Sequence, residues 1–277
     1  MGSMGKPASF VVLPLVLTQS PKYVSESTAP ITIAILNWNG RKWMEQFLPD
    51  VVRLSQPLGQ VLVVDNASTD DSVGWLRAHH PEVRVEVLDQ NYGFAGGYNR
   101  TLPFIDTPYL LLLNSDVEVS PGWLEPLYAW MEAEPELIGV QPKIRAQRNK
   151  THFEYAGAAG GFLDTLGYPF CRGRVFETCE ADQGQYDSRQ YIFWATGACC
   201  LVRTEPTRQL GLFDERFFAH MEEIDYFWRA QNAGWKVGVE PASTVYHVGG
   251  GTLDYASPRK AYLNFRNSLV ALLKNLP

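Results

Sequence analysis

The sequence has few of the features that define several large protein classes. It has four cysteines in 277 residues and no CxxC pair, so neither a disulfide scaffold nor a structural zinc site is expected, and a reducing compartment is the default. Its 24 basic residues are outnumbered by 30 acidic ones. This argues against nucleic acid as a partner, because phosphate neutralisation needs a basic surface. No run of about 18 apolar residues occurs, so no transmembrane helix is expected.

The first 29 residues differ from the rest of the chain. Met1–Met4 is typical of a leader left from expression, and we expect residues 1–29 to be an appendage, partly of that origin or flexible. Phe10–Leu17 is a short apolar run without an evident cleavage site. It therefore favours an edge strand or a disordered tail over a signal peptide. The abrupt end at Pro277 leaves open that the natural protein continues.

From residue 30 onward, strand patterns alternate with helix patterns. Four apolar runs typical of buried strands occur in the first part of this region: Ile31–Leu36, Gln60–Val64, Val83–Leu88 and Tyr109–Leu113. Helical patterns separate them, which indicates an α/β fold with a mostly parallel central sheet and helices on both faces. The alternation breaks down after Pro142. Further elements are predicted there, two strands and two helices: Tyr191–Val202, Trp235–Val239, Glu222–Asn232 and Tyr262–Leu276.

Polar side chains stand where three of these strands end, at one edge of the expected sheet. They come from the first, second and fourth strands: Asn37, Asn39, Asp65, Asn114, Ser115 and Asp116. Asp65 can accept hydrogen bonds from a nucleobase or ribose, or it can form an Asx-turn before the next helix. Asp116 suits a hard divalent cation that bridges a diphosphate, although a capped turn is also possible. The loop with Asp65, the glycine-rich loop after the third strand and the loop with Asp116 are expected to converge on one crevice.

A glycine-rich segment follows the third predicted strand. Gly93, Gly96 and Gly97, with Asn99 close behind, allow the backbone to approach a ligand, and the next helix would point its N–H groups at that ligand. The spacing matches neither the dinucleotide-binding pattern nor the P-loop. A ligand-binding loop and a plain turn therefore both remain open.

Three acids are crowded together in the second half of the chain. Glu222, Glu223 and Asp225 precede a run of aromatic residues. Such crowding can raise the pKa of one carboxyl group and create a general base, or the acids can simply favour a helix N-terminus. His247 suits Mn²⁺ or Mg²⁺ beside a carboxylate, or serves the core. Trp194 can stack on a sugar ring or fill the core.

In combination and order, these segments resemble a family 2 glycosyltransferase, in the branch of rhamnosyl- and galactofuranosyltransferases. The matching segments span residues 31–275: Ile35–Gly40, Val64–Asp70, Asn91–Asn99, Leu113–Val117, Thr196–Cys199, Phe213–Phe218, Glu222–Asp225 and His247–Gly250. The resemblance implies the GT-A fold over residues 30–277. It implies a nucleotide-sugar-binding half at 30–142 and an acceptor-binding and catalytic half at 143–277.

The resemblance also implies a reaction and its site residues. It implies inverting transfer of a sugar from a nucleotide-diphospho-sugar, with dTDP-rhamnose or a UDP-sugar as the leading donor, to a glycan or lipid-linked acceptor in cell-surface polysaccharide synthesis. The nucleotide and donor would contact Asn37, Asn39, Asp65, Gly93, Gly96, Gly97, Asn99, Asn114 and Ser115. Asp116 and His247 would hold Mn²⁺ or Mg²⁺. Glu223 would be the base, with Glu222 and Asp225 as alternatives, and Trp194 and Thr196 would contact the acceptor.

Two other functions remain open at this stage. A sugar-nucleotide nucleotidyltransferase shares this type of sheet, but its basic glycine-rich loop after the first strand is not found, because only Arg41 stands there. A non-catalytic nucleotide- or glycan-binding module is opposed by the three retained acids. Relatives often act at membranes, and the basic residues of the last helix permit interfacial binding. Packing of this helix on the catalytic domain is the alternative. We therefore expect a cytoplasmic location, and peripheral contact at the cytoplasmic face of the inner membrane stays open.

Overall fold

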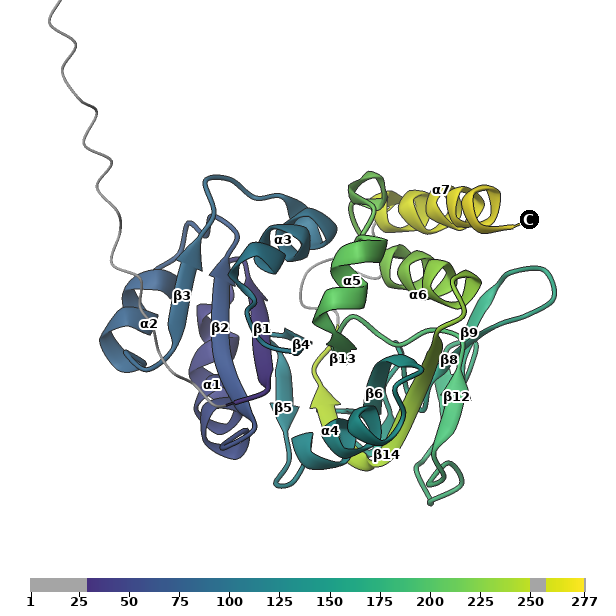
Figure 1. Ribbon diagram of the computed structural model, residues 1–277, viewed down its shortest axis with the longest axis horizontal. Helices are drawn as coiled ribbons and strands as arrows, with labels where there is room; N and C mark the ends of the chain where they lie inside the picture. The colour runs from purple at the N-terminus through teal and green to yellow at the C-terminus, as the bar shows by residue number, and fades with distance from the viewer. Residues whose placement is uncertain (1–28, 250–257, 277) are drawn as a thin grey trace, which may run out of the picture.

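The computed structural model describes residues 29–249 and 258–276. The predictions for residues 1–28 and for Gly250 lie outside this part of the chain. Ten strands form one large sheet, whose main order is β12-β14-β6-β13-β4-β1-β2-β3. Helices lie on both sides of it (Figure 1).

The first half of the chain supplies four strands that pair in parallel with one another and one short strand that pairs antiparallel. Its strands are β1 (Ile31–Asn37), β2 (Gly59–Asp65), β3 (Arg84–Val87), β4 (Tyr109–Asn114) and the short β5 (Val117–Val119). Its helices are α1 (Arg41–Leu54), α2 (Ser72–His79), α3 (Gly93–Thr101) and α4 (Leu124–Ala133). β1 pairs in parallel with β2 and β4, and β2 with β3. The prediction of parallel strands alternating with helices is therefore confirmed for this half.

The second half makes the sheet a mixed one. Its strands in the large sheet are β6 (Leu137–Ala146), β7 (Asn149–Phe153), β12 (Gln190–Ile192), β13 (Cys199–Arg203) and β14 (Lys236–His247). Two small hairpins lie apart from it: β8 (Gly161–Leu163) with β9 (Pro169–Cys171), and β10 (Arg174–Val175) with β11 (Thr178–Cys179). β13 is antiparallel to both neighbours, whereas β6 and β14 are parallel.

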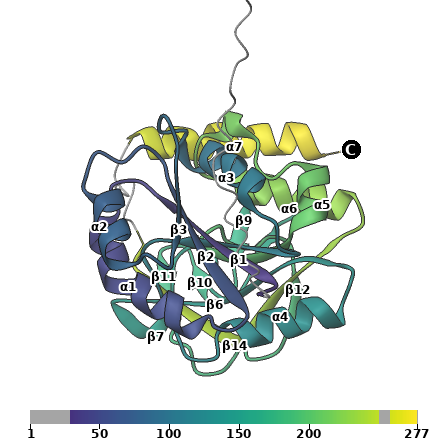
Figure 2. The same cartoon turned by 60° about the vertical axis from the view of Figure 1, so that its left-hand side comes forward.

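Three helices complete this half, namely α5 (Thr204–Leu210), α6 (Glu222–Asn232) and α7 (Pro258–Asn275). Short 3₁₀ turns occur at η1 (Leu102–Phe104) and η2 (Glu215–Phe217). Figures 1 and 2 show α7 alongside α6. No helix among the described residues combines the length and the hydropathy that a membrane span needs.

Two sequence predictions in this half need correction. The single strand predicted at Tyr191–Val202 is two strands, because β12 pairs with β14 at the edge of the sheet and β13 inserts between β4 and β6. The strand β6 was not predicted, and Pro142 in its middle is unusual for a strand inside a sheet. The register shift of β14 near this proline, between Glu240 and Thr244, accommodates it.

The apolar core is divided by the sheet into two clusters. Alternate residues of each strand face opposite sides, so Ile31, Ile33 and Ile35 of β1 pack with α1, α2 and α4. Ala34 of the same strand faces the other cluster, to which α3, α6 and α7 contribute. The prediction of helices on both faces is confirmed. The sheet edge where β1, β2 and β4 end is thus held rigidly from two sides.

Candidate active site

The polar residues predicted at the strand ends do meet. β1 and β2 end side by side at Asn37 and Asp65, and Asn114 ends β4 beside Leu36. We call the strand ends at Asn37, Asp65 and Asn114, with the residues just after them, the carboxyl edge. Asp65 and Asn37 are almost fully buried. The polar residues at the ends of β1, β2 and β4 therefore lie at one edge of the sheet.

Asp65 is held by donors from its own fold. Its carboxylate accepts from Asn37 Nδ2 at 2.8 Å, from Ser68 N at 2.8 Å and from Ser68 Oγ at 2.6 Å. The bond from Ser68 N is the Asx-turn considered from the sequence. A carboxylate has about four lone-pair sites, so three donors leave capacity for one bond to a ligand. Both roles considered for Asp65, the Asx-turn and a hydrogen bond to a ligand, are thus compatible with the geometry.

Side-chain amides tie the neighbouring loops together. Asn39, whose φ is +52°, accepts from Thr69 N at 2.7 Å. Asn66, which was not predicted as a site residue, donates to Gly93 O at 3.0 Å and accepts from Tyr92 N at 2.9 Å. The β1, β2 and glycine-rich loops therefore form one hydrogen-bonded unit.

The glycines were predicted to lie in a loop before a helix. They lie in the helix itself, because α3 already begins at Gly93. Gly93 needs its positive φ of +70° and lies against Phe218. A Cβ on Gly97 would come within 2.6 Å of Leu36, so this glycine lets α3 pack closely on β1. Asn99 exchanges hydrogen bonds with the backbone of Phe213. The segment thus joins the carboxyl edge to residues 213–218.

Asp116 and His247 lie together although 131 positions separate them. Their strands explain this, since β5 and β14 are antiparallel and Val117 stands opposite His247. His247 Nε2 is 3.2 Å from Asp116 Oδ1, and its Nδ1 is 3.6 Å from Glu154 Oε1. All three side chains are buried. Glu154 was missed from the sequence, because it lies in a segment with no clear periodicity.

Electrostatics couples these groups. Burial disfavours the charged imidazole, but the two carboxylates outweigh it and raise the pKa of His247 to about 10. Burial likewise opposes ionisation of Asp116, yet His247 and backbone N–H groups lower its pKa. The chain alone therefore holds an ion pair at this position.

The pair also fits a divalent cation. Two ligands about 2.1 Å from one ion and at right angles to each other are about 3 Å apart, close to the observed Asp116–His247 distance. Glu154 would support the imidazole from its other nitrogen, as carboxylates often do for metal-bound histidines. No cluster of three metal-binding side chains occurs among the described residues. A cation here would need its remaining ligands from substrate and water.

The three predicted acids have unlike surroundings at the start of α6. Asp225 is fully buried and is met by Arg229 at 3.0 Å, Lys274 at 2.8 Å and Asn275 at 2.9 Å. Glu222 and Glu223 each have one buried oxygen without a hydrogen-bond partner. Asp225 is therefore part of an internal ion-pair network, whereas the two glutamates retain unused acceptors.

Burial sets the protonation of the two glutamates. Burial and the neighbouring Glu223 charge raise the pKa of Glu222 well above its usual value. Burial raises the pKa of Glu223 to about 7, against the effect of backbone N–H groups at the helix start. Glu222 is buried, while Glu223 is partly exposed. Glu223 is thus the acid that both reaches the surface and changes charge near neutral pH.

Two contacts bring the acid pair close to the other site residues. Cys171 of β9 is buried, and burial raises the pKa of its thiol to about 11 with smaller contributions from Glu154 and Glu223. Glu154 and Glu223 therefore both lie near enough to influence the same thiol. Phe218, four residues before Glu222, touches Gly93. The acid pair, the glycine segment and the Asp116–His247 pair consequently belong to one region of the molecule.

The proposed acceptor residues are internal. Trp194 is 5% exposed and donates from Nε1 to Phe162 O at 3.0 Å, while a Cβ on Gly161 would collide with its ring. Thr196 is 3% exposed and accepts from Ala198 N at 3.2 Å. Both side chains are thus packed inside the described structure, and their contact with an acceptor stays a prediction.

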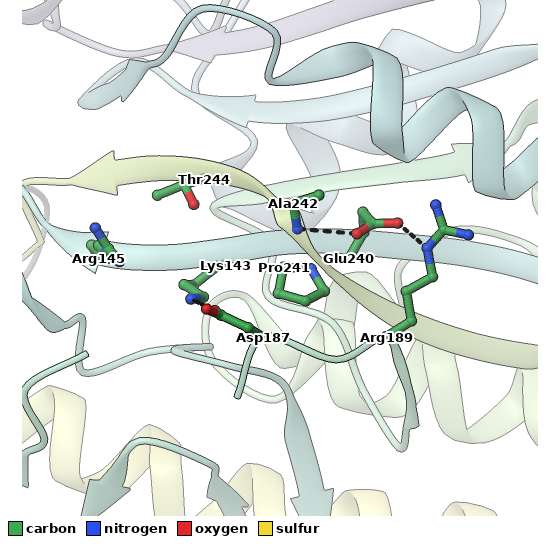
Figure 3. A pocket seen from close by; sticks show the side chains of 8 residues that line it. All are labelled: Lys143, Arg145, Asp187, Arg189, Glu240, Pro241, Ala242 and Thr244. Atoms are coloured by element: carbon green, nitrogen blue, oxygen red, sulfur yellow. Dashed lines mark hydrogen bonds and ion pairs between the residues drawn. The ribbon is translucent and has the colours of Figure 1, made fainter. Parts of the chain in front are cut away.

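A polar cavity of about 600 Å³ lies elsewhere, between β6, β14 and residues 182–190 (Figure 3). Its lining consists of Lys143, Arg145, Asp187, Arg189, Glu240, Pro241, Ala242 and Thr244. Each charged member has an oppositely charged partner. Thr244 and His247 point to opposite faces of β14, because strand residues alternate. The cavity is therefore separate from the Asp116–His247 pair.

Known glycosyltransferases resemble this chain over most of its length. A sequence model of the family described as "Glycosyl transferase family 2" matches residues 32–210. The chain is 27% identical over 239 residues to an N-acetylglucosaminyl-diphospho-decaprenol L-rhamnosyltransferase of Mycobacterium tuberculosis, covering 79% of this chain and 76% of that one. It is 21% identical over 246 residues to the low-salt glycan biosynthesis hexosyltransferase Agl10 of Haloferax volcanii, covering 87% and 75%.

Solved structures share the fold. GalNAc-T7 with UDP, GalNAc and Mn²⁺ aligns with a TM-score of 0.66 at 14% identity, over 90% of this chain and 48% of that one. The mannosyltransferase PcManGT from Pyrobaculum calidifontis, in complex with GDP-Man and Mn²⁺, aligns with a TM-score of 0.63 at 14% identity, over 90% and 65%. This chain thus spans about half of the former. The predicted GT-A fold is confirmed.

Proposed function

Because this chain belongs to glycosyltransferase family 2, in its rhamnosyltransferase-like branch, we propose that it transfers a sugar from a nucleotide-diphospho-sugar to a hydroxyl group, with inversion at the anomeric carbon. dTDP-rhamnose or a UDP-sugar is the donor, and a glycan or lipid-linked acceptor of cell-surface polysaccharide synthesis receives the sugar. The observation that carries the proposal is the partly exposed Glu223, with a pKa near 7 and an unused carboxylate oxygen.

In the proposed reaction, the Glu223 carboxylate takes the proton of the acceptor hydroxyl as that oxygen bonds to the anomeric carbon. The bond from this carbon to the diphosphate oxygen breaks with both electrons on the leaving group. A pKa near 7 suits this task, because it balances basicity against the ionised fraction at neutral pH. Glu222 stays neutral beside it, since its own pKa is raised further by burial. Asp225 is excluded as the base by its three internal donors.

The donor would lie along the carboxyl edge. Asp65 has capacity for one more hydrogen bond, and Asn114 and Ser115 are partly exposed beside it. Asp116 and His247 would hold Mn²⁺ or Mg²⁺, and the Mn²⁺ in the similar GalNAc-T7 and PcManGT structures supports this. Such an ion offsets the charge that grows on the departing diphosphate. Asp116 and His247 would thereby determine where the negative charge of the departing diphosphate is neutralised.

The alternative of a nucleotidyltransferase has no support from the geometry. The basic residue after the first strand, Arg41, pairs with Glu45 at 2.8 Å and Asp71 at 3.0 Å. Its guanidinium is thereby directed to α1 and α2 rather than held for a triphosphate. Sugar transfer, unlike nucleotidyl transfer, gives the glutamates at the start of α6 a chemical role.

Contact with a membrane surface is part of the proposal. Large apolar side chains on α7 are more than half exposed, namely Tyr262, Phe265, Leu269 and Leu273, and so is Leu276 just after the helix. Exposed Leu166 and Tyr168 stand beside them, because Gly167 packs on Leu272. The rhamnosyltransferase relative is named for an acceptor linked to decaprenol, a lipid. We expect this apolar face to rest on the bilayer that carries such an acceptor.

A donor panel tests the proposal. Wild type, Asp116→Ala and Glu223→Gln are incubated with UDP-, dTDP- and GDP-sugars plus Mn²⁺ or Mg²⁺, and released nucleoside diphosphate is measured with and without lipid-linked glycan acceptors. Metal-dependent release from one donor, lost in Asp116→Ala, is expected. No release from any donor, together with no thermal shift from UDP, dTDP or GDP plus metal, would contradict it.

A further inference from the structure

The four residues before α6 have an unusual backbone conformation. Phe218, His220 and Met221 have φ angles of +64°, +69° and +75°, in a region that side-chain-bearing residues rarely adopt. We call Phe218–Met221 the pre-α6 loop. Such conformations cost free energy and persist only where surrounding contacts impose them. Because Glu222 and Glu223 follow at once, whatever imposes this loop also sets the direction of their carboxylates.

One side chain of α7 supplies these contacts. Asn267 is fully buried, and its Nδ2 lies 2.9 Å from the carbonyl oxygen of Phe217, 2.9 Å from that of Ala219 and 2.8 Å from that of His220. An amide nitrogen carries two N–H groups, so three carbonyls share them through a bifurcated bond. The three acceptors bracket the left-handed residues.

The arrangement joins distant parts of the chain. Asn267 lies 47 positions after His220, and both α6 and α7 follow the segment 32–210 that the family model matches. Figure 1 shows α7 lying along α6 on the outer side of the molecule. A residue of the last described helix therefore reaches the backbone that leads into the candidate base.

We propose that Asn267 is a positioning residue of this enzyme, which fixes the pre-α6 loop and thereby aims the carboxylates of Glu222 and Glu223 at the carboxyl edge. The inference rests on the proposed function, because it takes Glu223 as the proton acceptor. Without the amide, the carbonyls of Phe217, Ala219 and His220 lose these side-chain hydrogen bonds, which leaves Phe217 O with only its bond from Ala219 N among the described residues, and the loop can leave its left-handed conformation. The base then moves away from the acceptor hydroxyl, while Asp65 and Asp116 stay in place.

The test compares Asn267→Ala with Thr207→Val. Thr207 is a matched control, because it is fully buried and its hydroxyl bonds Tyr226 of α6 at 2.7 Å, away from the pre-α6 loop. We measure kcat, donor KM, thermal midpoint and the pH profile of kcat for the intact chain. Asn267→Ala should lower kcat by about 30- to 100-fold, as a misplacement of about 1 Å can, with donor KM changed by less than about threefold.

The pH profile separates positioning from mere loss of stability. Glu223 is faced by Glu222 from its own helix and by Cys171 from β9. In Asn267→Ala, the loosened loop admits water to the acid pair, and the midpoint of the rise in kcat should move below that of wild type. Thr207→Val should lower the thermal midpoint, keep the wild-type pH profile and hold kcat within about threefold.

Two results would overturn the inference. One is a folded Asn267→Ala protein with wild-type kcat and pH profile. The other is a loss of kcat in both variants that follows their loss of thermal stability. If Asn267→Ala does not fold, Asn267→Ser, which keeps one donor, is judged by the same criteria and should be intermediate. Glu223→Gln is measured in parallel: if it keeps wild-type transfer, the base role proposed for Glu223 fails and this inference with it, whereas an inactive Glu223→Gln beside a normal Asn267→Ala rejects this inference alone.

Discussion

The carboxyl edge and the start of α6 bury carboxylates in opposite ways. At the edge, Asp65 receives three hydrogen bonds from Asn37 and Ser68. At the start of α6, Glu222 and Glu223 each leave a buried oxygen without a partner. Buried polar groups are normally paired, and unpaired ones call for an explanation. In the first region the chain itself supplies the donors to the carboxylate, and in the second the proposed function assigns that role to the acceptor hydroxyl.

The same contrast occurs within one turn of a helix. Asp225 stands two residues after Glu223 and is satisfied by Arg229, Lys274 and Asn275. Its negative charge is thereby compensated inside the fold. Three acids within one helical turn thus divide into one whose charge the fold compensates and two that each keep an unpaired buried oxygen.

The largest expected effect separates the two glutamates. Glu223→Gln should reduce sugar transfer by about 10³-fold, because general base catalysis contributes 10² to 10⁴. Glu222→Gln should cost less than about tenfold, since Glu222 is already neutral at pH 7 and an amide resembles it. Initial rates at saturating donor measure both. Equal losses in the two variants would show that the acids act as one unit.

The next largest effect is expected on stability at the carboxyl edge, where the buried Asp65 carboxylate receives three hydrogen bonds. Asp65→Asn should destabilise the fold by about 3 kcal/mol, because the carboxylate loses charged hydrogen bonds in a buried place. Asp71→Asn is the control, since its ion pair with Arg41 is exposed and such pairs are worth under about 1 kcal/mol. Urea unfolding measures the difference. Similar values for the two variants would refute the role given to Asp65.

The buried glutamates at the start of α6 should make the free energy of unfolding depend on pH. The folded-state pKa of Glu223 is raised to about 7 from a usual 4.5, so ionisation costs folding free energy as pH rises between these values. The wild type should therefore lose about 2 kcal/mol of stability from pH 4.5 to pH 7, allowing for partial exposure. Glu223→Gln should lose less. Urea midpoints at several pH values test this, and parallel curves would contradict it.

The smallest effect on stability is expected outside both regions. The double change Phe265→Ser and Leu269→Ser on the exposed face of α7 should alter unfolding free energy by less than about 0.5 kcal/mol per site. It should still reduce the fraction that sediments with phospholipid vesicles by several fold. Asn264→Ser, on the same helix and also exposed, is the control. Unchanged sedimentation of the double variant would contradict the proposed membrane contact.

The carboxyl edge could be predicted from the sequence because its signals are local. Asp65 and Asn114 each close an apolar run, and parallel strands bring such ends together without further information. The start of α6 was also predicted at its observed residue, because three acids preceding an aromatic run are a helix N-terminal pattern. These features need only the residues within one or two elements.

The remaining features depend on contacts between distant segments. Glu154 belongs to the site only because β6, β7 and β14 bring it to His247, and nothing in its neighbours indicates that. Trp194 is internal because Gly161 of the β8–β9 hairpin lies against its ring. The distinction between Asp225 and Glu223 likewise depends on Lys274 and Asn275 of α7. Tertiary packing decided each of these, and the local sequence carries no trace of it.

The pH dependence of kcat for sugar transfer tests the central claim most directly. The account predicts a rate that rises with pH to a plateau, with a midpoint near the value of about 7 to which burial raises the pKa of Glu223. Glu223→Gln should be slow and should show no such rise. A midpoint near the ordinary glutamate pKa of about 4.3, or a Glu223→Gln enzyme that keeps the rise, would contradict the account.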